Sequence, residues 1–322
     1  MSHIPPLLSV VLCNSNSADY TLGCIESLYR HPPAGPCEII LVDNASRDDC
    51  VARVRVAYPA VRVAVAAQPQ GFSRNYNMGI RMATGAYLLI LNNDTLVAQG
   101  TLQRMIDAME NDPAYGMVGP LMVGGDGRIQ TPCLRPLPSV TAYVLRQLVL
   151  DPGMPLGRLW QRIAQRRIAR HPSGPVPCIS GAAMLVSRRS LELVGMLDET
   201  YDFYYEDVEW CHRMQICGLQ VGYVAESRLI HFGGQSSVKV KVWARQHEYL
   251  SILHYFRQHR GLGRTGATLI WLTTLIGFLL RGVGFLLAEA WGRTPQHARA
   301  YLYLWHWLIV RGPDTPKMKG SH

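Results

Sequence analysis

The first apolar run of the sequence is followed by neither of the two glycine signatures by which many nucleotide-binding sheets hold phosphate. No Gly-x-Gly-x-x-Gly follows the first apolar run, and no Gly-x-x-x-x-Gly-Lys-Ser/Thr occurs anywhere. The first absence counts against a dinucleotide cofactor, and the second excludes a P-loop NTPase. A nucleotide site in this chain would therefore use Asn and Asp side chains rather than a glycine cradle.

Paired cysteine motifs are also missing. The eight cysteines include no Cys-x-x-Cys and no His–Cys ligand spacing, and the N-terminus has no secretory signal. We therefore expect reduced thiols in a cytosolic compartment. With 48% hydrophobic and 17% charged residues among 322, the composition is typical of a packed globule with one large or two moderate domains.

Acidic residues are scarce at the C-terminal end alone. Residues 238–322 hold twelve Lys and Arg against three acids, whereas residues 1–237 hold twenty of each. A neutral body with a basic, apolar tail suggests an anionic partner for the tail. On charge alone, nucleic acid and a membrane surface both qualify.

Short apolar runs alternate with helical patterns through the first hundred residues. The runs are 7–12, 38–42, 61–65 and 87–91. Alternation at this pitch predicts an α/β fold with a doubly wound, mostly parallel sheet. The Gly- and Pro-rich residues 111–138 would then form a crossing segment.

Polar residues follow these runs, and such residues meet at the sheet edge where open α/β sheets bind ligands. The stretch 91–95 allows two interpretations, because Asn and Asp suit both. Asn92, Asn93 and Asp94 could turn the chain and cap the next helix. Alternatively, Asp94 could hold a divalent cation that is shared with a diphosphate.

Three acids within four residues follow the aromatic run 203–205. Glu206 and Asp207 would occupy the first turn of a helix, where capping explains one of them. A carboxylate in a partly apolar cleft can also act as a general base, so Asp207 is the candidate base and Glu206 its support. His231 is either a core histidine or, beside a glycine pair, a site residue.

Two later segments are apolar and basic. In 155–169, one helical face carries Leu, Trp and Ile, and the roughly opposite face carries arginines. This pattern fits an ordinary surface helix, or a flap that touches a membrane surface or an anionic acceptor. The segment 265–288 is borderline for a bilayer span of about 20 residues and contains Arg281. It suits a helix in the membrane interface, a spanning helix, or a soluble cap or oligomer interface.

Taken together, the motifs resemble those of family 2 glycosyltransferases with the GT-A fold, in the rhamnosyltransferase-like branch. The resemblance extends from Ser9 to about Ser236. Its motifs are Ser9–Asn16, Leu41–Ser46, Gly71-Phe72, Asn77–Gly79, Leu91–Thr95, Ser180–Ala182 and Tyr205–Glu209. The sequence departs from the family at Asn92, which replaces the first Asp of the metal motif.

The resemblance implies an inverting transferase that uses Mg²⁺ or Mn²⁺. Asp94 and His231 would hold the metal, and Asp207 would be the base, supported by Glu206. The implied contacts to the sugar nucleotide are Asn14, Asn16, Asp43, Asn44, Gly71, Phe72, Asn77, Asn92 and Asn93.

The implied donor is a UDP- or dTDP-sugar, and the implied acceptor is a saccharide, lipid-linked in cell-surface polysaccharide synthesis. We expect a catalytic domain over 1–237, with a nucleotide-sugar half to about residue 130 and an acceptor half from 131. The helical extension 238–322 would bind the cytoplasmic face of the cell membrane, peripherally or by shallow insertion, and is compatible with a homo-oligomer. No nucleic acid is expected.

Two alternatives remain at this point. A nucleotidyltransferase would use a similar sheet and metal, although the glycine-rich, lysine-bearing loop that it needs after the first strand is absent. A non-catalytic, membrane-associated binding protein would be favoured if Asp94, Asp207 and His231 did not converge.

Overall fold

The computed structural model describes residues 5–149, 155–233, 238–289 and 296–313. Two compact units make up the chain. The first consists of Met1–Leu137, Arg167–Asp202 and Glu206–Gly233, and the second of Pro138–Arg166, Phe203–Tyr205 and Gly234–His322. The expected domain boundary at residue 237, which lies outside the described residues, stays a prediction.

Among the described residues, nine strands form one sheet in the first unit. They are β1 (Leu8–Asn14), β2 (Cys37–Asp43), β3 (Arg62–Val65), β4 (Tyr87–Asn92), β5 (Thr95–Val97), β6 (Tyr115–Val123), β7 (Gly174–Pro175), β8 (Ala183–Ser187) and β9 (Gln220–His231). Eight follow the order β3-β2-β1-β4-β8-β6-β9-β5, and β7 pairs with β9. Strands β1 to β4 are parallel, while β8 runs antiparallel to β4 and β6. The predicted α/β fold with a mostly parallel sheet is confirmed.

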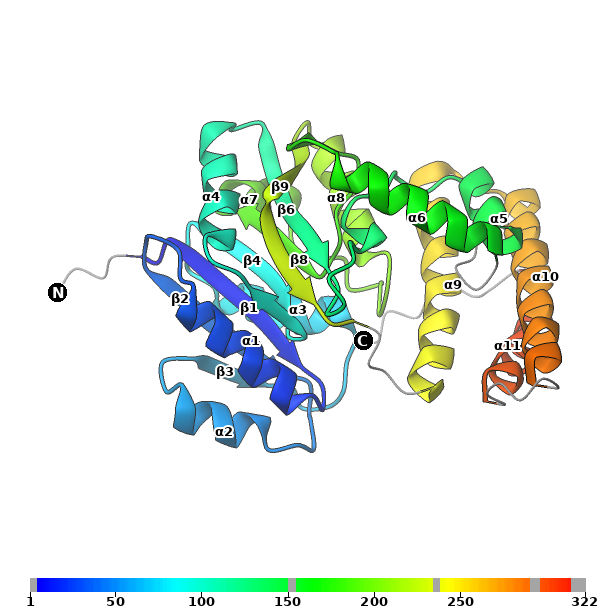
Figure 1. The fold of residues 1–322 in the computed structure, drawn as a ribbon, viewed down its shortest axis with the longest axis horizontal. Helices are drawn as coiled ribbons and strands as arrows, with labels where there is room; N and C mark the ends of the chain where they lie inside the picture. Colours follow the sequence, from blue (N-terminus) through cyan, green and yellow to red (C-terminus); the bar gives the residue numbers. More distant parts are fainter. Residues whose placement is uncertain (1–4, 150–154, 234–237, 290–295, 314–322) are drawn as a thin grey trace. The chain divides into compact units, whose positions relative to one another are not determined.

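Helices cover both faces of this sheet (Figure 1). The helices of the first unit are α1 (Ala18–Arg30), α2 (Cys50–Ala57), α3 (Phe72–Met82), α4 (Thr101–Asn111), α7 (Arg188–Val194) and α8 (Glu206–Ile216), with a 3-10 turn at Thr131–Cys133. Because both faces are covered, the central strands are mostly apolar, and Val10, Val11 and Leu12 of β1 are all fully buried. All eight cysteines are free.

The expectation for residues 111–138 was wrong in part. This Gly- and Pro-rich stretch contains β6, a nine-residue strand in the interior of the sheet. Pro120 lies in the strand where its register with β9 shifts between Pro120 and Leu121. Proline is tolerated at such irregularities because a ladder hydrogen bond is already missing there. The Gly and Pro content of 111–138 therefore gave no indication of β6, which pairs with β8 and β9.

Helix α3 packs against β1 and β2 through Gly79. A Cβ at this position would lie 2.3 Å from Val11 Cγ1 and 3.1 Å from Val42 Cγ2. We expect Gly79→Ala to lower the free energy of unfolding by about 1–3 kcal/mol, since the added methyl overpacks a buried contact. Gly23→Ala in α1 is the matched control, because its nearest neighbour would be Leu96 at 3.9 Å. Denaturant unfolding of both should show a loss for Gly79 alone; equal effects would contradict the close packing.

The second unit is helical. Its helices are α5 (Val140–Leu148), α9 (Val238–Arg260), α10 (Arg264–Glu289), α11 (Gln296–Arg311) and most of α6 (Pro155–Ala169), which continues past Arg166 into the first unit. Helix α10 contacts both α5 and α11.

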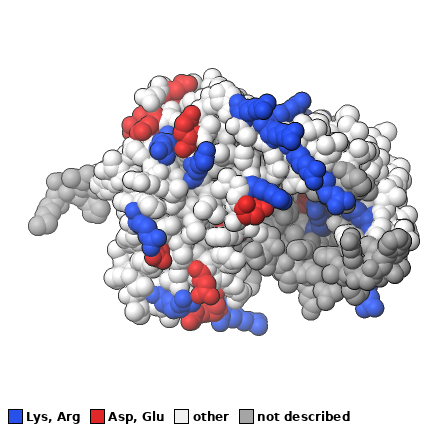
Figure 2. Space-filling model, viewed as in Figure 1, with Lys and Arg blue, Asp and Glu red and all other residues white. Residues whose placement is uncertain are grey.

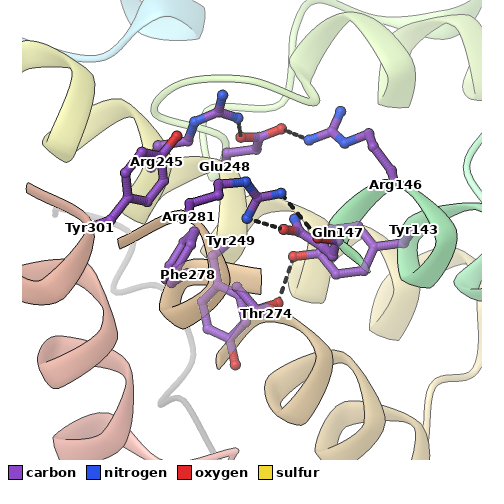
Figure 3. A pocket seen from close by; sticks show the side chains of 10 residues that line it. All are labelled: Tyr143, Arg146, Gln147, Arg245, Glu248, Tyr249, Thr274, Phe278, Arg281 and Tyr301. Carbon is purple, nitrogen blue, oxygen red and sulfur yellow. Dashed lines mark hydrogen bonds and ion pairs between the residues drawn. The ribbon is translucent and has the colours of Figure 1, made fainter. Parts of the chain in front are cut away.

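A polar stripe of Thr273, Gly277 and Arg281 interrupts the apolar surface of α10, and all three residues are buried against the protein. Arg281 is only 8% exposed, and its guanidinium donates to the Gln147 side-chain oxygen at 3.1 Å and to its carbonyl at 3.2 Å (Figure 3). A Cβ on Gly277 would lie 2.9 Å from the same carbonyl, so glycine lets α5 approach. The stripe therefore packs on α5 within the chain.

Close to Arg281, Glu248 of α9 lies between two further arginines. Its carboxylate pairs with Arg146 and, at 2.6 Å, with Arg245 (Figure 3). Burial alone would raise the pKa of Glu248, but the two guanidinium groups outweigh burial and lower it to about 2. The buried carboxylate is therefore charged at neutral pH and links α5 to α9.

The opposite side of α10 is an exposed aliphatic row. Its members are Leu269, Leu272, Ile276, Leu280, Val283 and Leu287, each at least 42% exposed. Among the described helices, α10 is the one long and apolar enough from Arg264 to Leu287 to cross a membrane. Core helices of soluble proteins can be equally apolar. The length and hydropathy of α10 therefore do not decide between a helix in the membrane interface, a spanning helix, and a soluble cap or oligomer interface.

Candidate active site

The carboxyl ends of three neighbouring strands meet at one edge of the sheet. In register, Asn14 of β1 pairs with Asp43 of β2, and Cys13 of β1 pairs with Asn92 of β4. The polar clusters identified in the sequence therefore lie together where open α/β sheets bind ligands.

Asn14 organises the first cluster from a fully buried position. Its Nδ2 donates to Asp43 Oδ1 at 2.8 Å, and to Ser46 Oγ and Asp48 Oδ1 at 3.1 Å each. Its Oδ1 accepts from the Thr21 hydroxyl at 3.0 Å. Asn14 thus holds two carboxylates side by side. The second, Asp48, was missed in the sequence because it lies in a loop without a motif.

Two residues with left-handed backbone shape the adjoining loops, Asn16 with a φ of 55° and Ala45 with a φ of 50°. Asn16 Oδ1 accepts from the Arg47 backbone N–H at 2.8 Å. Asn44 accepts from the Gln70 N–H at 2.8 Å and donates to its carbonyl at 3.1 Å. Asn16 and Asn44 fix the loops at the carboxyl edge of the sheet. Their contacts to the sugar nucleotide stay predictions.

The start of α3 lies against the loop that precedes α8. A Cβ on Gly71 would be 2.8 Å from Asp202 Cα, and the Phe72 N–H donates to the Asp202 carbonyl at 2.8 Å. This approach explains why glycine stands at position 71. The predicted donor contacts of Gly71 and Phe72 stay predictions.

Asn77 is buried, and its amide is bonded to the segment before that loop. Its Nδ2 donates to the Leu197 carbonyl and to Glu199 Oε1 at 2.9 Å each, and its Oδ1 accepts from the Leu197 N–H at 3.1 Å. These bonds make Asn77 an anchor for residues 197–199. A direct contact between Asn77 and the sugar nucleotide would have to compete with these three hydrogen bonds.

Asn92 and Asn93 are also bonded within the protein. Asn92 Oδ1 accepts from the Tyr76 hydroxyl at 3.3 Å. Asn93 Nδ2 donates to the hydroxyls of Ser17 and Thr21 at 2.7 Å each, which ties the end of β4 to the start of α1. Their roles toward a donor remain predictions.

Asp94 and His231, the two predicted metal ligands, lie side by side. Strand β5 pairs antiparallel with β9 so that Thr95 stands opposite His231, which brings the preceding Asp94 to the histidine. Asp94 Oδ1 is 3.3 Å from His231 Nε2, and Asp94 Oδ2 accepts from the Gly233 N–H at 3.0 Å.

Gln130 fixes the tautomer of His231. Its Nε2 donates to the His231 carbonyl at 2.7 Å, and a carbonyl can only accept, so the amide orientation is set. The other end of the amide, Oε1, then faces His231 Nδ1 at 2.7 Å and requires a proton on that nitrogen. The Nε2 lone pair of a neutral His231 therefore points toward the Asp94 carboxylate.

Asn92 Nδ2, at 3.5 Å, can also donate to His231 Nε2. A divalent cation between Nε2 and the Asp94 carboxylate would use both electron-rich atoms as ligands. Two adjacent ligands on one six-coordinate ion, with bonds of about 2.1 Å, are about 3.0 Å apart. A metal-binding histidine also donates its second N–H to a fixed acceptor, as His231 does to Gln130. The pair therefore fits a divalent metal.

The chain would supply only part of the coordination shell. Within the described residues, no group of three or more His, Cys, Asp and Glu could hold a metal ion. An ion on Asp94 and His231 would need oxygen ligands from outside the chain, such as a diphosphate and water. This arrangement would make metal binding depend on the nucleotide.

Asp207 is the member of the second acidic cluster that pairs with an arginine. Its Oδ2 pairs with the Arg135 guanidinium and accepts from the Gly181 N–H at 2.8 Å. Its Oδ1 accepts from the Val208 N–H at 2.8 Å. Each carboxylate oxygen has two lone pairs, so Oδ1 keeps one for a proton from an acceptor.

Glu206 is the neutral member. It is 5% exposed, and its Oε2 has no hydrogen-bond partner in the described part of the chain. Burial and the charge of Asp207 raise the pKa of Glu206 to about 8. At neutral pH Glu206 is therefore mostly protonated.

This buried acid predicts a pH dependence of stability. Between its ordinary pKa of 4.5 and about 8, the folded protein keeps a proton that the unfolded chain has released. The free energy of unfolding should fall as pH rises through this window, by on the order of a few kcal/mol. Denaturant unfolding of the wild type and Glu206→Gln measures the effect. We expect a shallower fall for Glu206→Gln; identical slopes would contradict the raised pKa.

The two clusters are connected through the sheet. The Asn92 N–H donates to the Ala182 carbonyl at 2.9 Å, and the preceding Gly181 binds Asp207. Burial raises the pKa of the Tyr76 hydroxyl, and Asp94 and Glu206, both ionised at the alkaline pH where a tyrosine titrates, act in the same direction. Both acidic clusters therefore lie close enough to influence one hydroxyl group.

Two residues of this site besides Asp48 were not identified in the sequence. Gln130 and Arg135 lie in the irregular stretch after β6, where no periodic pattern or motif marks a polar residue. Their partners, His231 and Asp207, are 101 and 72 residues away along the chain. No signal in one sequence links such positions.

Comparison with known proteins decides the family. The model of "Glycosyl transferase family 2" matches residues 9–195, more than half of the chain. The chain belongs to glycosyl transferase family 2. The resemblance identified from its motifs is confirmed, and this family 2 member is a glycosyltransferase.

Curated relatives add detail about similar proteins. The family 2 chain is 28% identical over 218 residues to an N-acetylglucosaminyl-diphospho-decaprenol L-rhamnosyltransferase of Mycobacterium tuberculosis, covering 63% of this chain and 68% of the relative. It is 24% identical to the dTDP-rhamnosyl transferase RfbF of Shigella flexneri over 63% of this chain and 62% of the relative.

Solved structures share the fold of this family 2 chain. A mannosyltransferase from Pyrobaculum calidifontis in complex with GDP-Man and Mn²⁺ aligns over 96% of this chain and 87% of its own, with a TM-score of 0.54 and 16% identity. GalNAc-T7 with UDP, GalNAc and Mn²⁺ aligns over 77% and 50%, with a TM-score of 0.53 and 17% identity. The GT-A fold is thereby confirmed.

Proposed function

We propose that this glycosyltransferase moves a sugar, such as rhamnose, from a nucleoside-diphosphate donor to a lipid-linked saccharide. Transfer would be an inverting, single displacement that requires Mg²⁺ or Mn²⁺, in the synthesis of cell-surface polysaccharide. The observation that carries the proposal is the Asp94–His231 pair, 3.3 Å apart, with the tautomer of His231 fixed by Gln130. Family membership favours this function over nucleotidyl transfer and over a non-catalytic binding protein.

A divalent metal bound to Asp94 and His231 would neutralise the charge that develops on the leaving diphosphate. The amide-rich edge at Asn14, Asp43 and Asn44 would receive the nucleoside of the donor. The Mn²⁺ in the solved relatives supports this assignment of the metal.

Asp207 would take the proton of the acceptor hydroxyl on its Oδ1. The hydroxyl oxygen then attacks the anomeric carbon from the face opposite the diphosphate, the bond from carbon to phosphate oxygen breaks, and the nucleoside diphosphate leaves with the electron pair. Arg135 and the Gly181 N–H hold Oδ2, so the carboxylate is oriented before the acceptor arrives. Glu206 beside it is mostly protonated at neutral pH.

The lipid-linked acceptor is proposed from two observations. The Mycobacterium tuberculosis relative is named for a diphospho-decaprenol-linked sugar. In this chain, the exposed aliphatic row of α10 lies in the basic stretch 238–322 and would lie against the cytoplasmic face of the cell membrane.

A donor screen tests the proposal. The purified protein is incubated with UDP-, dTDP- and GDP-sugars, Mn²⁺ and a lipid-linked saccharide, and release of nucleoside diphosphate is followed. We expect release that depends on both metal and acceptor with at least one sugar nucleotide. Release of pyrophosphate from a nucleoside triphosphate instead would support nucleotidyl transfer and overturn the proposal.

A further inference from the structure

Helix α6 exposes an apolar row that the rest of the described chain leaves uncovered. Leu156, Leu159 and Trp160 are 58%, 52% and 47% exposed, and Ile163 is 36% exposed. Their spacing of three and four residues places them on one side of the helix. Single exposed apolar residues are ordinary, but a contiguous row marks an interaction surface.

A second side of the same helix is positively charged. Arg158, Arg162 and Arg166 recur every fourth residue, and α6 contains no acidic residue. None of the three forms an ion pair with a described residue. Figure 2 shows the resulting row of basic side chains along α6.

The third side of α6 faces the protein. Gly157 and Ile168 are its buried residues. At about 100° per residue, the buried side, the apolar row and the arginine row each lie roughly a third of a turn from the next. The arginines therefore stand beside the apolar row rather than beneath the helix, and they can reach a plane into which Leu159 and Trp160 insert.

We propose that α6 is a membrane-docking helix that binds the surface of an anionic lipid bilayer. The apolar row enters the boundary between headgroups and acyl chains, and the arginines contact lipid phosphates. An exposed row of Leu and Trp beside arginines, without acids, is the composition of helices that lie in this interface. This inference rests on the proposed function, because a lipid-linked acceptor requires the enzyme at a membrane.

Charge complementarity selects the bilayer over another protein surface. The second unit carries sixteen Lys and Arg against four acids in its sequence, so an anionic surface attracts the unit as a whole. The exposed aliphatic row of α10 provides apolar contact in the same unit. Helix α6 adds three arginines to the part of the binding that depends on lipid charge.

Removal of the three α6 arginines tests whether they supply charge-dependent binding to lipid. We compare the wild type with a triple variant, Arg158→Gln, Arg162→Gln and Arg166→Gln, on phosphatidylcholine vesicles with and without phosphatidylglycerol. Each arginine near an anionic surface contributes about fivefold, so the triple variant should partition about 100-fold more weakly onto anionic vesicles. Partition onto neutral vesicles should be unchanged.

A charge-matched control separates α6 from net charge. Arg55→Gln, Arg104→Gln and Arg189→Gln remove three exposed arginines from the first unit. We expect this control to bind anionic vesicles as the wild type does. An equal loss in the two triple variants, or no loss in the α6 variant, overturns the proposal.

Insertion of the apolar row has its own measurement. Lipids with brominated acyl chains quench tryptophans that enter the bilayer, and Trp160→Phe keeps the apolar contact but removes one fluorophore. We expect Trp160→Phe to bind as the wild type does and to show less quenching. Unchanged quenching would place Trp160 outside the bilayer and overturn the proposal.

The remaining outcomes distinguish the docking helix from the proposed function. Vesicle binding requires no sugar transfer, so α6-dependent binding without transfer to any acceptor would keep the docking helix and overturn the function. If the protein transfers sugar to an acceptor and the α6 variants bind vesicles normally, the glycosyltransferase function stands and the docking helix is overturned. If Leu159→Ser splits a dimer in light scattering and leaves vesicle binding intact, the row is an interface between copies and the proposal fails.

Discussion

Replacement of Asp207 by Asn is expected to lower kcat by about 10²–10⁴-fold while binding of the sugar nucleotide persists. General-base assistance has this magnitude, and an amide of the same shape cannot take the acceptor proton. The variant keeps an oxygen for its contacts with Arg135 and Gly181, so the local fold should be retained. Single-turnover kinetics and calorimetric titration with the donor measure the two quantities separately.

Glu206→Gln is the matched control for this experiment. Glu206 is already protonated at neutral pH because burial and Asp207 raise its pKa to about 8, so an amide reproduces its charge. We expect Glu206→Gln to keep far more activity than Asp207→Asn at pH 7. If Asp207→Asn lost donor binding and turnover to the same extent, Asp207 would have a structural role instead.

Asp94→Ala is expected to abolish metal-dependent transfer, with a loss of kcat/KM of at least about 100-fold at any Mn²⁺ concentration. The substitution removes the acidic ligand and leaves His231 alone to hold the ion, so the charge on the leaving diphosphate is no longer neutralised. Activity measured across a titration of Mn²⁺ and Mg²⁺ tests this. Unchanged metal dependence in Asp94→Ala would contradict the assignment of the site.

Gln130→Leu provides a graded comparison. Loss of the group that orients a ligating histidine weakens metal affinity by about 10–100-fold. We therefore expect activity of Gln130→Leu to recover at high Mn²⁺, whereas that of Asp94→Ala does not. Failure of Gln130→Leu to recover would show that Gln130 does not act through metal binding at His231, and recovery of Asp94→Ala would contradict Asp94 as the acidic ligand.

The sequence was most informative where the fold obeys local patterns. Apolar runs and the polar residues after them located β1, β2 and β4 and indicated that Asn14, Asp43 and Asp94 meet at one edge, because parallel strands align their carboxyl ends. The first turn of α8, with Glu206 and Asp207, followed from its charge pattern. These features depend on residues close together in the chain.

Features that depend on distant pairing were not predictable. Strand β6 was hidden by its glycines and proline, and its place between β8 and β9 is set by tertiary packing. Gln130 and Arg135 gain their roles only because β6 returns the chain to His231 and Asp207. Arg281 was visible within an apolar segment, but its packing on Gln147 required the position of α5.

The anomeric configuration of the product tests the central claim most directly. With whichever sugar nucleotide supports transfer, NMR coupling constants at the anomeric carbon are compared between the donor and the newly formed glycoside. A single displacement with Asp207 as base predicts inversion of that centre. Retention of the donor's configuration would contradict the account, because it requires two successive displacements or a different site for the chemistry.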